Sequence, residues 1–202
     1  AVGDRALQDN TANFNTAVGG FALYKNTIAA SNTAFGYAAL EQNTTGEYNT
    51  AIGAAALDLN TTSSNNTAVG YNALTTNTAG NNTAIGYKAL EANTTGADNV
   101  ALGTGALTAN TTASNNIAVG KDALNDNTTG IRNTAVGQSA LGANTTASNN
   151  TAVGYQTLGS NTTGAQNNAF GYDAMYTNTT GANNEAFGYQ ALYSNTTGSN
   201  NV

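Results

Sequence analysis

Large apolar residues recur along this chain at fixed distances from a repeated glycine, and Asn and Thr fill most positions between them. One residue before each glycine stands a large apolar residue, and four residues after it stands Leu, which Met175 replaces once. Ala occupies the position two before the glycine in every copy. The twelve glycines lie 16 or 17 residues apart, at Gly3, Gly19, Gly36, Gly53, Gly70, Gly86, Gly103, Gly120, Gly137, Gly154, Gly171 and Gly188.

This spacing predicts short strands that are joined by turns and stacked coil upon coil. Gly recurs inside the motif and Asn-Thr-Thr follows the Leu closely, so turn residues interrupt the chain too often for helices of ordinary length. A fixed period below about 30 residues indicates an array of similar coils. We therefore predict an all-β fold, a parallel β-solenoid of twelve coils, in which residues 1–202 form a single array from a longer fibre protein.

The two apolar columns are the predicted core. In the central copies they comprise Val69, Leu74, Ile85, Leu90, Leu102, Leu107, Val119, Leu124, Val136, Leu141, Val153 and Leu158. Two large side chains per coil make a thin core, so contacts with other chains are a second source of stability. The constant Ala and Gly, such as Ala118 and Gly120, put small residues on a strand face where another chain could pack. Alternatively, these alanines fit a tight core within one chain.

Two asparagine columns are as regular as the apolar ones. In stacked coils each column places identical amides about 4.8 Å apart, a spacing at which they form hydrogen-bonded ladders. Both 16-residue copies lose their residue between the first Asn-Thr pair and the second Asn, as an outward turn tolerates. The first column, seven after the glycine, includes Asn43, Asn60, Asn77, Asn93, Asn110, Asn127, Asn144 and Asn161, and the second, four before it, includes Asn49, Asn66, Asn82, Asn99, Asn116, Asn133 and Asn150.

Composition and charge exclude several classes of function. The net charge of −6 disfavours nucleic acid and anionic membranes as partners. No apolar run approaches the 18 residues of a membrane helix, so we expect no membrane insertion in this segment. The chain has no His or Cys to act as nucleophile, base or soft-metal ligand, and it lacks the glycine-rich calcium repeat. We predict no enzyme activity, cofactor or metal.

The motif itself resembles a known repeat. The runs Asn99-Val100-Ala101-Leu102-Gly103 and Asn116-Ile117-Ala118-Val119-Gly120 are similar to the signature of YadA-like head repeats in trimeric autotransporter adhesins, and to repeats of phage-type tail fibres. In most other copies Thr replaces the first aliphatic residue, and the copy is longer than the typical head repeat.

The resemblance implies a left-handed parallel β-roll in which three chains lie side by side. It further implies a structural shaft or head of an extracellular fibre, either a bacterial surface adhesin or a phage-type tail fibre, which holds or presents a receptor-binding tip. The implied partners are two more copies of the chain, in a homotrimer, and a cell-surface or glycan receptor. The implied location is the cell surface or a virion tail fibre.

Three features allow other interpretations. Stacked threonines such as Thr44 and Thr61 favour an ice- or carbohydrate-surface-binding solenoid, although adjacent threonines point oppositely in a strand. Asn-Thr-Thr matches the N-glycosylation acceptor, for instance at Asn43, Asn60, Asn93, Asn110 and Asn161, but a ladder asparagine has its amide occupied. One column of tyrosines could stack on sugars or pack across coils, namely Tyr37, Tyr71, Tyr87, Tyr155, Tyr172 and Tyr189.

Overall fold

Eleven three-residue strands form one parallel sheet in the computed structural model, which describes residues 1–202. The sheet order equals the sequence order, and each strand pairs in register with the same positions of the next repeat. The strands are β1 (Thr16–Val18), β2 (Thr33–Phe35), β3 (Thr50–Ile52), β4 (Thr67–Val69), β5 (Thr83–Ile85), β6 (Val100–Leu102), β7 (Ile117–Val119), β8 (Thr134–Val136), β9 (Thr151–Val153), β10 (Asn168–Phe170) and β11 (Glu185–Phe187).

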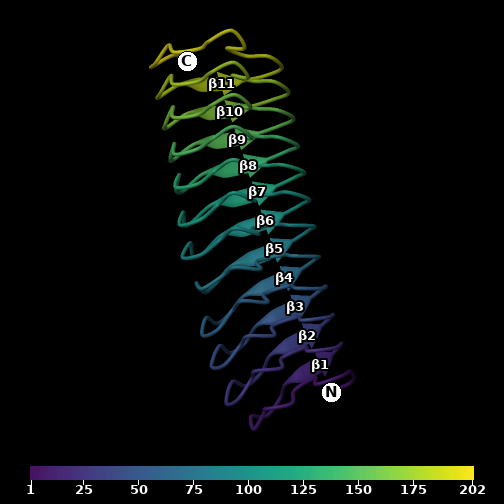
Figure 1. The fold of residues 1–202 in the computed structure, drawn as a ribbon. Helices are drawn as coiled ribbons and strands as arrows, with labels where there is room; N and C mark the ends of the chain where they lie inside the picture. The colour runs from purple at the N-terminus through teal and green to yellow at the C-terminus, as the bar shows by residue number, and fades with distance from the viewer.

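The chain climbs by one coil per repeat, and its termini lie at opposite ends of the stack (Figure 1). The prediction of a parallel β-solenoid with about 17 residues per coil is confirmed. Eleven of the twelve repeats contribute a strand, whereas the first joins the sheet through a single bridge between Val2 and Val18. The elements include no helix that could span a membrane.

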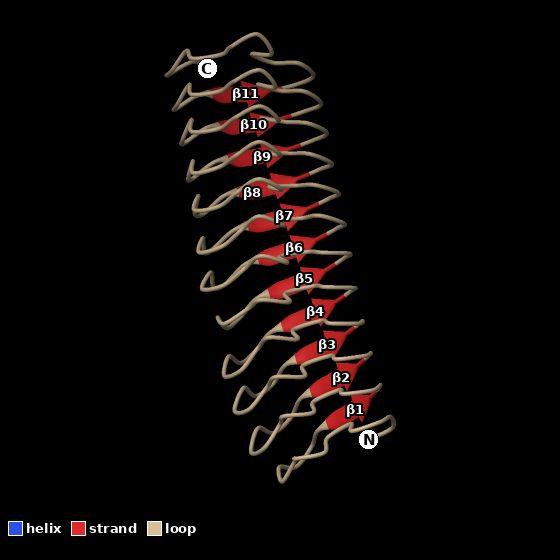
Figure 2. Ribbon diagram, viewed as in Figure 1, coloured by secondary structure: helices blue, strands red, loops and turns tan.

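Most of each coil lies outside the sheet. The strands occupy one side of the stack, and turns and loops form the remainder (Figure 2). Of 130 backbone–backbone hydrogen bonds, 110 lie outside the strands, and many of these join equivalent positions of successive coils. The stacking of turns on turns therefore supplies more of the backbone pairing than the sheet does.

The repeated glycine ends each strand for two reasons. At Gly120 the backbone φ is +133°, a conformation that residues with a Cβ rarely adopt. A Cβ built at Gly120 would lie 2.6 Å from the carbonyl carbon of Gly137 in the next coil. The sequence interpretation offered an unusual φ or a close backbone approach, and both apply.

The Leu four residues after the glycine has a left-handed backbone conformation, and its side chain lies in the core. Leu107 has φ of +53° and Met175, its counterpart, has φ of +52°. A left-handed conformation costs a residue other than Gly about 1–3 kcal/mol, and complete burial of the Leu side chain offsets this by a similar amount. Leu107 and Met175 are both fully buried.

The core differs from the predicted one in half of its members. It contains two alanines and a Leu from most coils, and the six predicted leucines Leu74, Leu90, Leu107, Leu124, Leu141 and Leu158 are all 0% exposed. The prediction was wrong for the residue before the glycine, since none of Val69, Ile85, Leu102, Val119, Val136 and Val153 belongs to the core.

Strand alternation explains this correction. The constant Ala is the middle residue of each strand and points inward, so its two neighbours point to the outer face of the sheet. Ala118, for example, is 0% exposed, while Ile117 in the same strand is 42% exposed. The alanines thus fit a tight core within one chain and do not form a surface on which another chain could pack.

Candidate functional site: the asparagine wall and the outer sheet face

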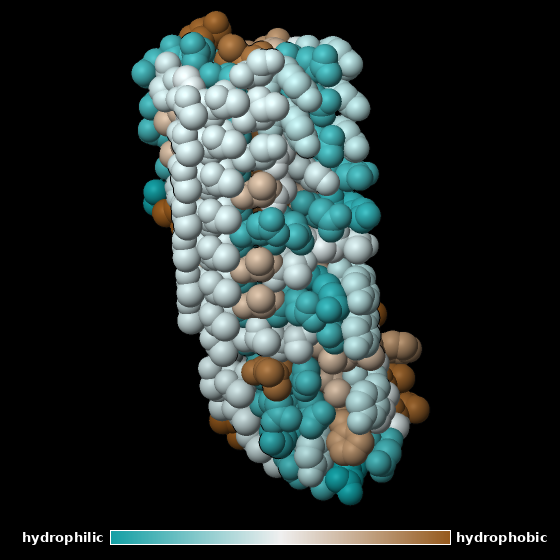
Figure 3. Space-filling view, turned by 45° about the horizontal axis from the view of Figure 1, so that its top comes forward, coloured by the Kyte–Doolittle hydropathy of each residue, from teal (hydrophilic) through white to brown (hydrophobic).

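The candidate functional features of this molecule are surfaces and buried hydrogen-bond networks, and none of them is a cleft. It contains no pocket and no group of three or more metal-ligating side chains. The features that set it apart are the two asparagine columns, which lie next to the turns, and the apolar outer face of the sheet. Residues of intermediate hydropathy, drawn in white, form columns along the length of the surface, because equivalent positions of successive repeats lie above one another (Figure 3).

The first asparagine column is a ladder of side-chain amides. Asn110 Nδ2 donates to Asn93 Oδ1 at 2.9 Å and to the Ala113 carbonyl of its own coil at 3.0 Å. Its Oδ1 accepts from Asn127 Nδ2 at 3.0 Å. Both amide protons and the oxygen are therefore used, as burial requires. Every predicted member of this column is 0% exposed.

The second column forms its ladder through the backbone. Asn116 Oδ1 accepts from the backbone N–H of Asn133 at 2.9 Å, and the backbone N–H of Asn116 donates to Asn99 Oδ1 at 3.0 Å. The expected amide-to-amide bond occurs only at a few positions, such as Asn99 to Asn82 at 3.2 Å. All seven predicted members of this column are buried, at most 1% exposed.

One carbonyl per coil joins the two columns. The Gly130 carbonyl accepts from Asn127 Nδ2 of its own coil at 3.0 Å and from Asn116 Nδ2 of the preceding coil at 3.0 Å. The same arrangement recurs at Ala147, which accepts from Asn144 and Asn133. Since a buried polar group without a partner is costly, this shared acceptor makes the two columns a single network, which we call the asparagine wall.

The wall has a defect at the shortened copy that runs from Gly70 to Gly86. Asn66 Nδ2, in the coil before this copy, is buried without a hydrogen-bond partner. Asn77 Nδ2 approaches Ser63 Oγ at 3.4 Å, whereas the other members of its column from Asn26 onward bond to the preceding asparagine oxygen. The Ser63 hydroxyl donates instead to Asn60 Oδ1. The missing turn residue removes the carbonyl geometry that the wall uses elsewhere.

The outer face of the sheet carries apolar side chains along its whole length. In this column Phe187 is 65% and Phe35 56% exposed, and Ile52 and Ile85 are 40% and 42% exposed. Phe170 stacks on Phe187 with ring centroids 5.1 Å apart. A contiguous exposed apolar stripe is typical of a surface that contacts another molecule.

The exposed tyrosines, one residue after the repeated glycine, form stacks between successive coils. Tyr155 and Tyr172 are stacked at 5.1 Å, Tyr172 and Tyr189 at 5.4 Å, and Tyr71 and Tyr87 at 5.8 Å. Because the rings stack in successive coils, much of each ring face contacts a neighbouring ring. Packing across coils therefore accounts for this column, and the ring faces inside a stack are not free to hold a sugar.

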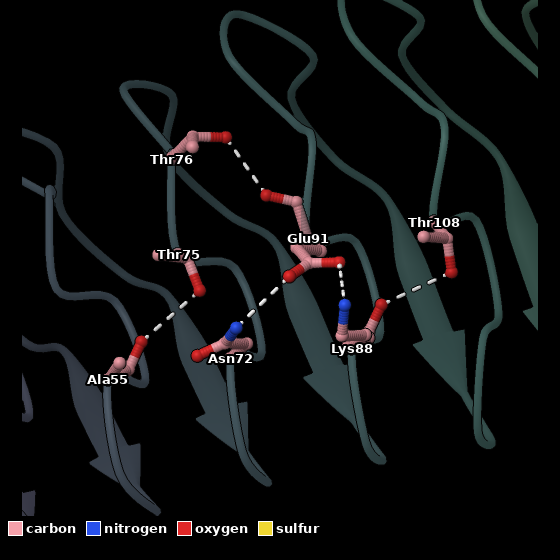
Figure 4. A network of polar contacts seen from close by, with 7 residues as sticks. All are labelled: Ala55, Asn72, Thr75, Thr76, Lys88, Glu91 and Thr108. Carbon is pink, nitrogen blue, oxygen red and sulfur yellow. Dashed lines mark hydrogen bonds and ion pairs between the residues drawn. The ribbon is translucent and has the colours of Figure 1, made fainter.

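A polar network joins the shortened copy to the coils before and after it (Figure 4). Glu91 pairs with Lys88 at 3.3 Å, accepts from Asn72 Nδ2 at 3.0 Å, and its carbonyl accepts from Thr76 Oγ1 at 2.9 Å. The hydrogen bond and the charge of Glu91 raise the pKa of Lys88. Lys88 and Glu91 belong to the same coil, so the contacts of this network that join coils are those from Asn72 and Thr76 to Glu91.

Asp58 is the one acid with a strongly shifted pKa. Burial, and to a smaller extent the nearby charge of Glu41, raises the pKa of Asp58 to about 6. Its Oδ1 is buried without a hydrogen-bond partner. Glu41 and Asp58 lie in the same column of successive coils, so they form a carboxyl pair whose ionised form is unfavourable.

Comparisons with protein-family models, curated proteins and solved structures found no match for this chain. The chain is a β-solenoid repeat protein with stacked asparagine ladders.

Proposed function

We propose that this array is a non-catalytic structural segment, shaft or head, of an extracellular fibre that holds or presents a receptor-binding tip. The fibre is either a bacterial surface adhesin or a phage-type tail fibre. The observation that carries the proposal is the combination of an uninterrupted stack of coils with a surface that has no pocket. A stack of near-identical coils forms an elongated rod, and it contains few unique positions at which an active site could form.

The proposed assembly is a homotrimer of left-handed rolls that contact one another lengthwise through the outer sheet face. Ile85 is 42% exposed and Phe170 is 37% exposed in the single chain, within a column of similar residues. Burying apolar area stabilises association by about 25 cal/mol per Å² before the entropic costs of binding. This face replaces the Ala–Gly surface of the sequence interpretation, because those alanines are buried.

Sedimentation of the chain across a micromolar dilution series tests the assembly. We expect a trimer for the unmodified chain and a smaller species for the double variant Ile85→Lys, Phe170→Lys. The matched control is Leu59→Lys, which changes an equally exposed apolar residue (47%) away from the sheet. A folded monomer for the unmodified chain at every concentration would contradict the homotrimer, while leaving the single-chain solenoid intact.

The second candidate is a solenoid that binds an ice or carbohydrate surface. It is favoured by one column of exposed threonines in successive coils, including Thr95, Thr112 and Thr129. The adjacent column contributes less, since its hydroxyls donate to backbone carbonyls of the next coil, as Thr94 Oγ1 does to Thr111 at 2.9 Å. Thermal hysteresis and pull-down on insoluble polysaccharide measure this candidate directly.

A further inference from the structure

The fold divides the N-glycosylation acceptor sequences of this chain into two structural classes. Nine of them read Asn-Thr-Thr, and in each the asparagine belongs to the first column of the asparagine wall: Asn43, Asn60, Asn93, Asn110, Asn127, Asn144, Asn161, Asn178 and Asn195. Transfer of a sugar requires a free side-chain amide. Asn110 instead donates both amide protons and is 0% exposed, and the others are buried in the same way except Asn195. Asn195 lies half-buried in the last coil but also donates both amide protons, so these sequences are closed in the folded chain.

Three further acceptor sequences read Asn-Asn-Thr and begin at Asn65, Asn81 and Asn149. Each first asparagine lies at the corner that precedes a strand, is exposed, and has φ between +61° and +63°. Asparagine tolerates this left-handed conformation better than most residues. None of the three side chains forms a hydrogen bond within the chain, and the Thr two residues later is part of a strand with its hydroxyl also unbonded.

We propose that the folded array presents three N-glycan acceptor sites, Asn65, Asn81 and Asn149, and closes the nine Asn-Thr-Thr sequences. The donor is a sugar activated as a diphosphate. Asn Nδ2 attacks the anomeric carbon, the bond from that carbon to the diphosphate oxygen breaks, and the diphosphate leaves with the electron pair. The amide proton passes to a base of the transferase. The proposal does not depend on the fibre role, and it concerns the single folded chain, because a homotrimer formed through the outer sheet face would cover Thr67, Thr83 and Thr151 of the three acceptor sequences.

The chain contains its own matched controls. Asn115 and Asn183 occupy the same column, are exposed, and have φ of +63° and +57°. They differ in the residue two positions later, which is Ile117 or Glu185 in place of Thr. The corner geometry is therefore common to all five asparagines, and only three of them carry the hydroxyl that the acceptor sequence requires.

The experiment treats the folded full chain with a purified sequon-specific N-glycosyltransferase and uridine diphosphate glucose. The transferase is one that modifies synthetic peptides of residues 63–69 and 108–114, so that both acceptor sequences are substrates when unfolded. Peptide mass spectrometry then locates each added hexose. We expect hexose on Asn65, Asn81 and Asn149, and none on the nine ladder asparagines or on Asn115 and Asn183.

Two variants sharpen the result. Thr67→Val removes one acceptor sequence with a residue that the equivalent position already accepts at Val100, and it should abolish the hexose on Asn65 alone. Ile117→Thr creates an acceptor sequence at Asn115 and should add a fourth site. Hexose on a ladder asparagine of a chain that keeps its native circular dichroism would overturn the proposal, as would three unmodified corners alongside modified peptides.

Discussion

The regular coils from Gly86 onward and the shortened copy from Gly70 to Gly86 belong to one continuous sheet but differ in the hydrogen bonds of the asparagine wall. In the regular region every first-column amide from Asn93 to Asn195 bonds to the asparagine before it. In the shortened copy that bond is replaced at Asn77, and Asn66 Nδ2 of the preceding coil has no partner. The strand register nevertheless continues unchanged, since Thr67 pairs with Thr83 and Val69 with Ile85.

The sheet and the Leu core tolerate a change in turn length, whereas the asparagine wall does not. The sheet and the Leu core depend on residues that stay in phase with the glycine, so a residue lost from the turn leaves them untouched. The asparagine wall depends on a turn carbonyl, and the lost residue displaces it. The polar network around Glu91 joins the shortened copy to the next coil through Asn72 and Thr76.

The largest expected effect is common to both regions. Leu107→Ala in a regular coil and Leu74→Ala in the shortened copy should each cost about 2–5 kcal/mol, because both side chains are fully buried and leave a cavity. Denaturant midpoints measure the two losses. A clearly smaller loss for Leu74→Ala would show that the shortened copy also loosens the core, against our comparison.

The next effect distinguishes the regions. Asn116→Ala removes a side chain that donates to the Gly130 carbonyl and accepts from the backbone N–H of Asn133, and it should cost about 1–3 kcal/mol. Asn66→Ala removes one accepted bond together with an unpaired buried amide, so we expect a smaller loss. Thermal melting of the two variants side by side provides the measurement, and equal losses would mean that the defect has no energetic consequence.

A repair of the turn should stabilise the chain. Insertion of one Thr after Thr78 restores the 17-residue spacing and offers Asn66 a carbonyl partner, worth about 0.5–1.5 kcal/mol. Deletion of Thr129 from a regular copy is the reverse experiment and should destabilise. If the insertion lowers the melting temperature, the Ser63 hydroxyl and not the turn length is responsible for the defect.

The smallest effect is a pH dependence at Asp58. Its pKa is about 6 in the fold against 3.8 as the ordinary value, so the folded chain binds the extra proton. The resulting stabilisation is complete below pH 3.8 and is lost as the pH rises through about 6. Asp58→Asn should raise the melting temperature at pH 7 and flatten its change between pH 4 and 7, while the exposed Asp126→Asn should leave that profile as it is.

The sequence alone determined the architecture of this protein. Because glycine, Leu and two asparagines recur with one period, stacking in phase was the arrangement that aligned them all, and the structure confirms the parallel β-solenoid. The same phase identified residues that prove to be buried, such as Leu107 and Asn110, since a position that never varies across stacked coils meets the same neighbours in each.

Only the tertiary structure decided which face each apolar column takes. Val119 and Leu124 are equally regular in sequence, yet Leu124 is fully buried and Val119 lies on the outer face beside the inward Ala118. The reason is that alternation in the strand lets either Ala118 or its two neighbours face inward, and the pattern of residue types does not say which. Leu124 lies beyond the strand, where a left-handed backbone directs it into the core. Likewise, two asparagine columns of identical chemistry form different ladders, because only the coil geometry decides whether an amide or a backbone N–H lies opposite each oxygen.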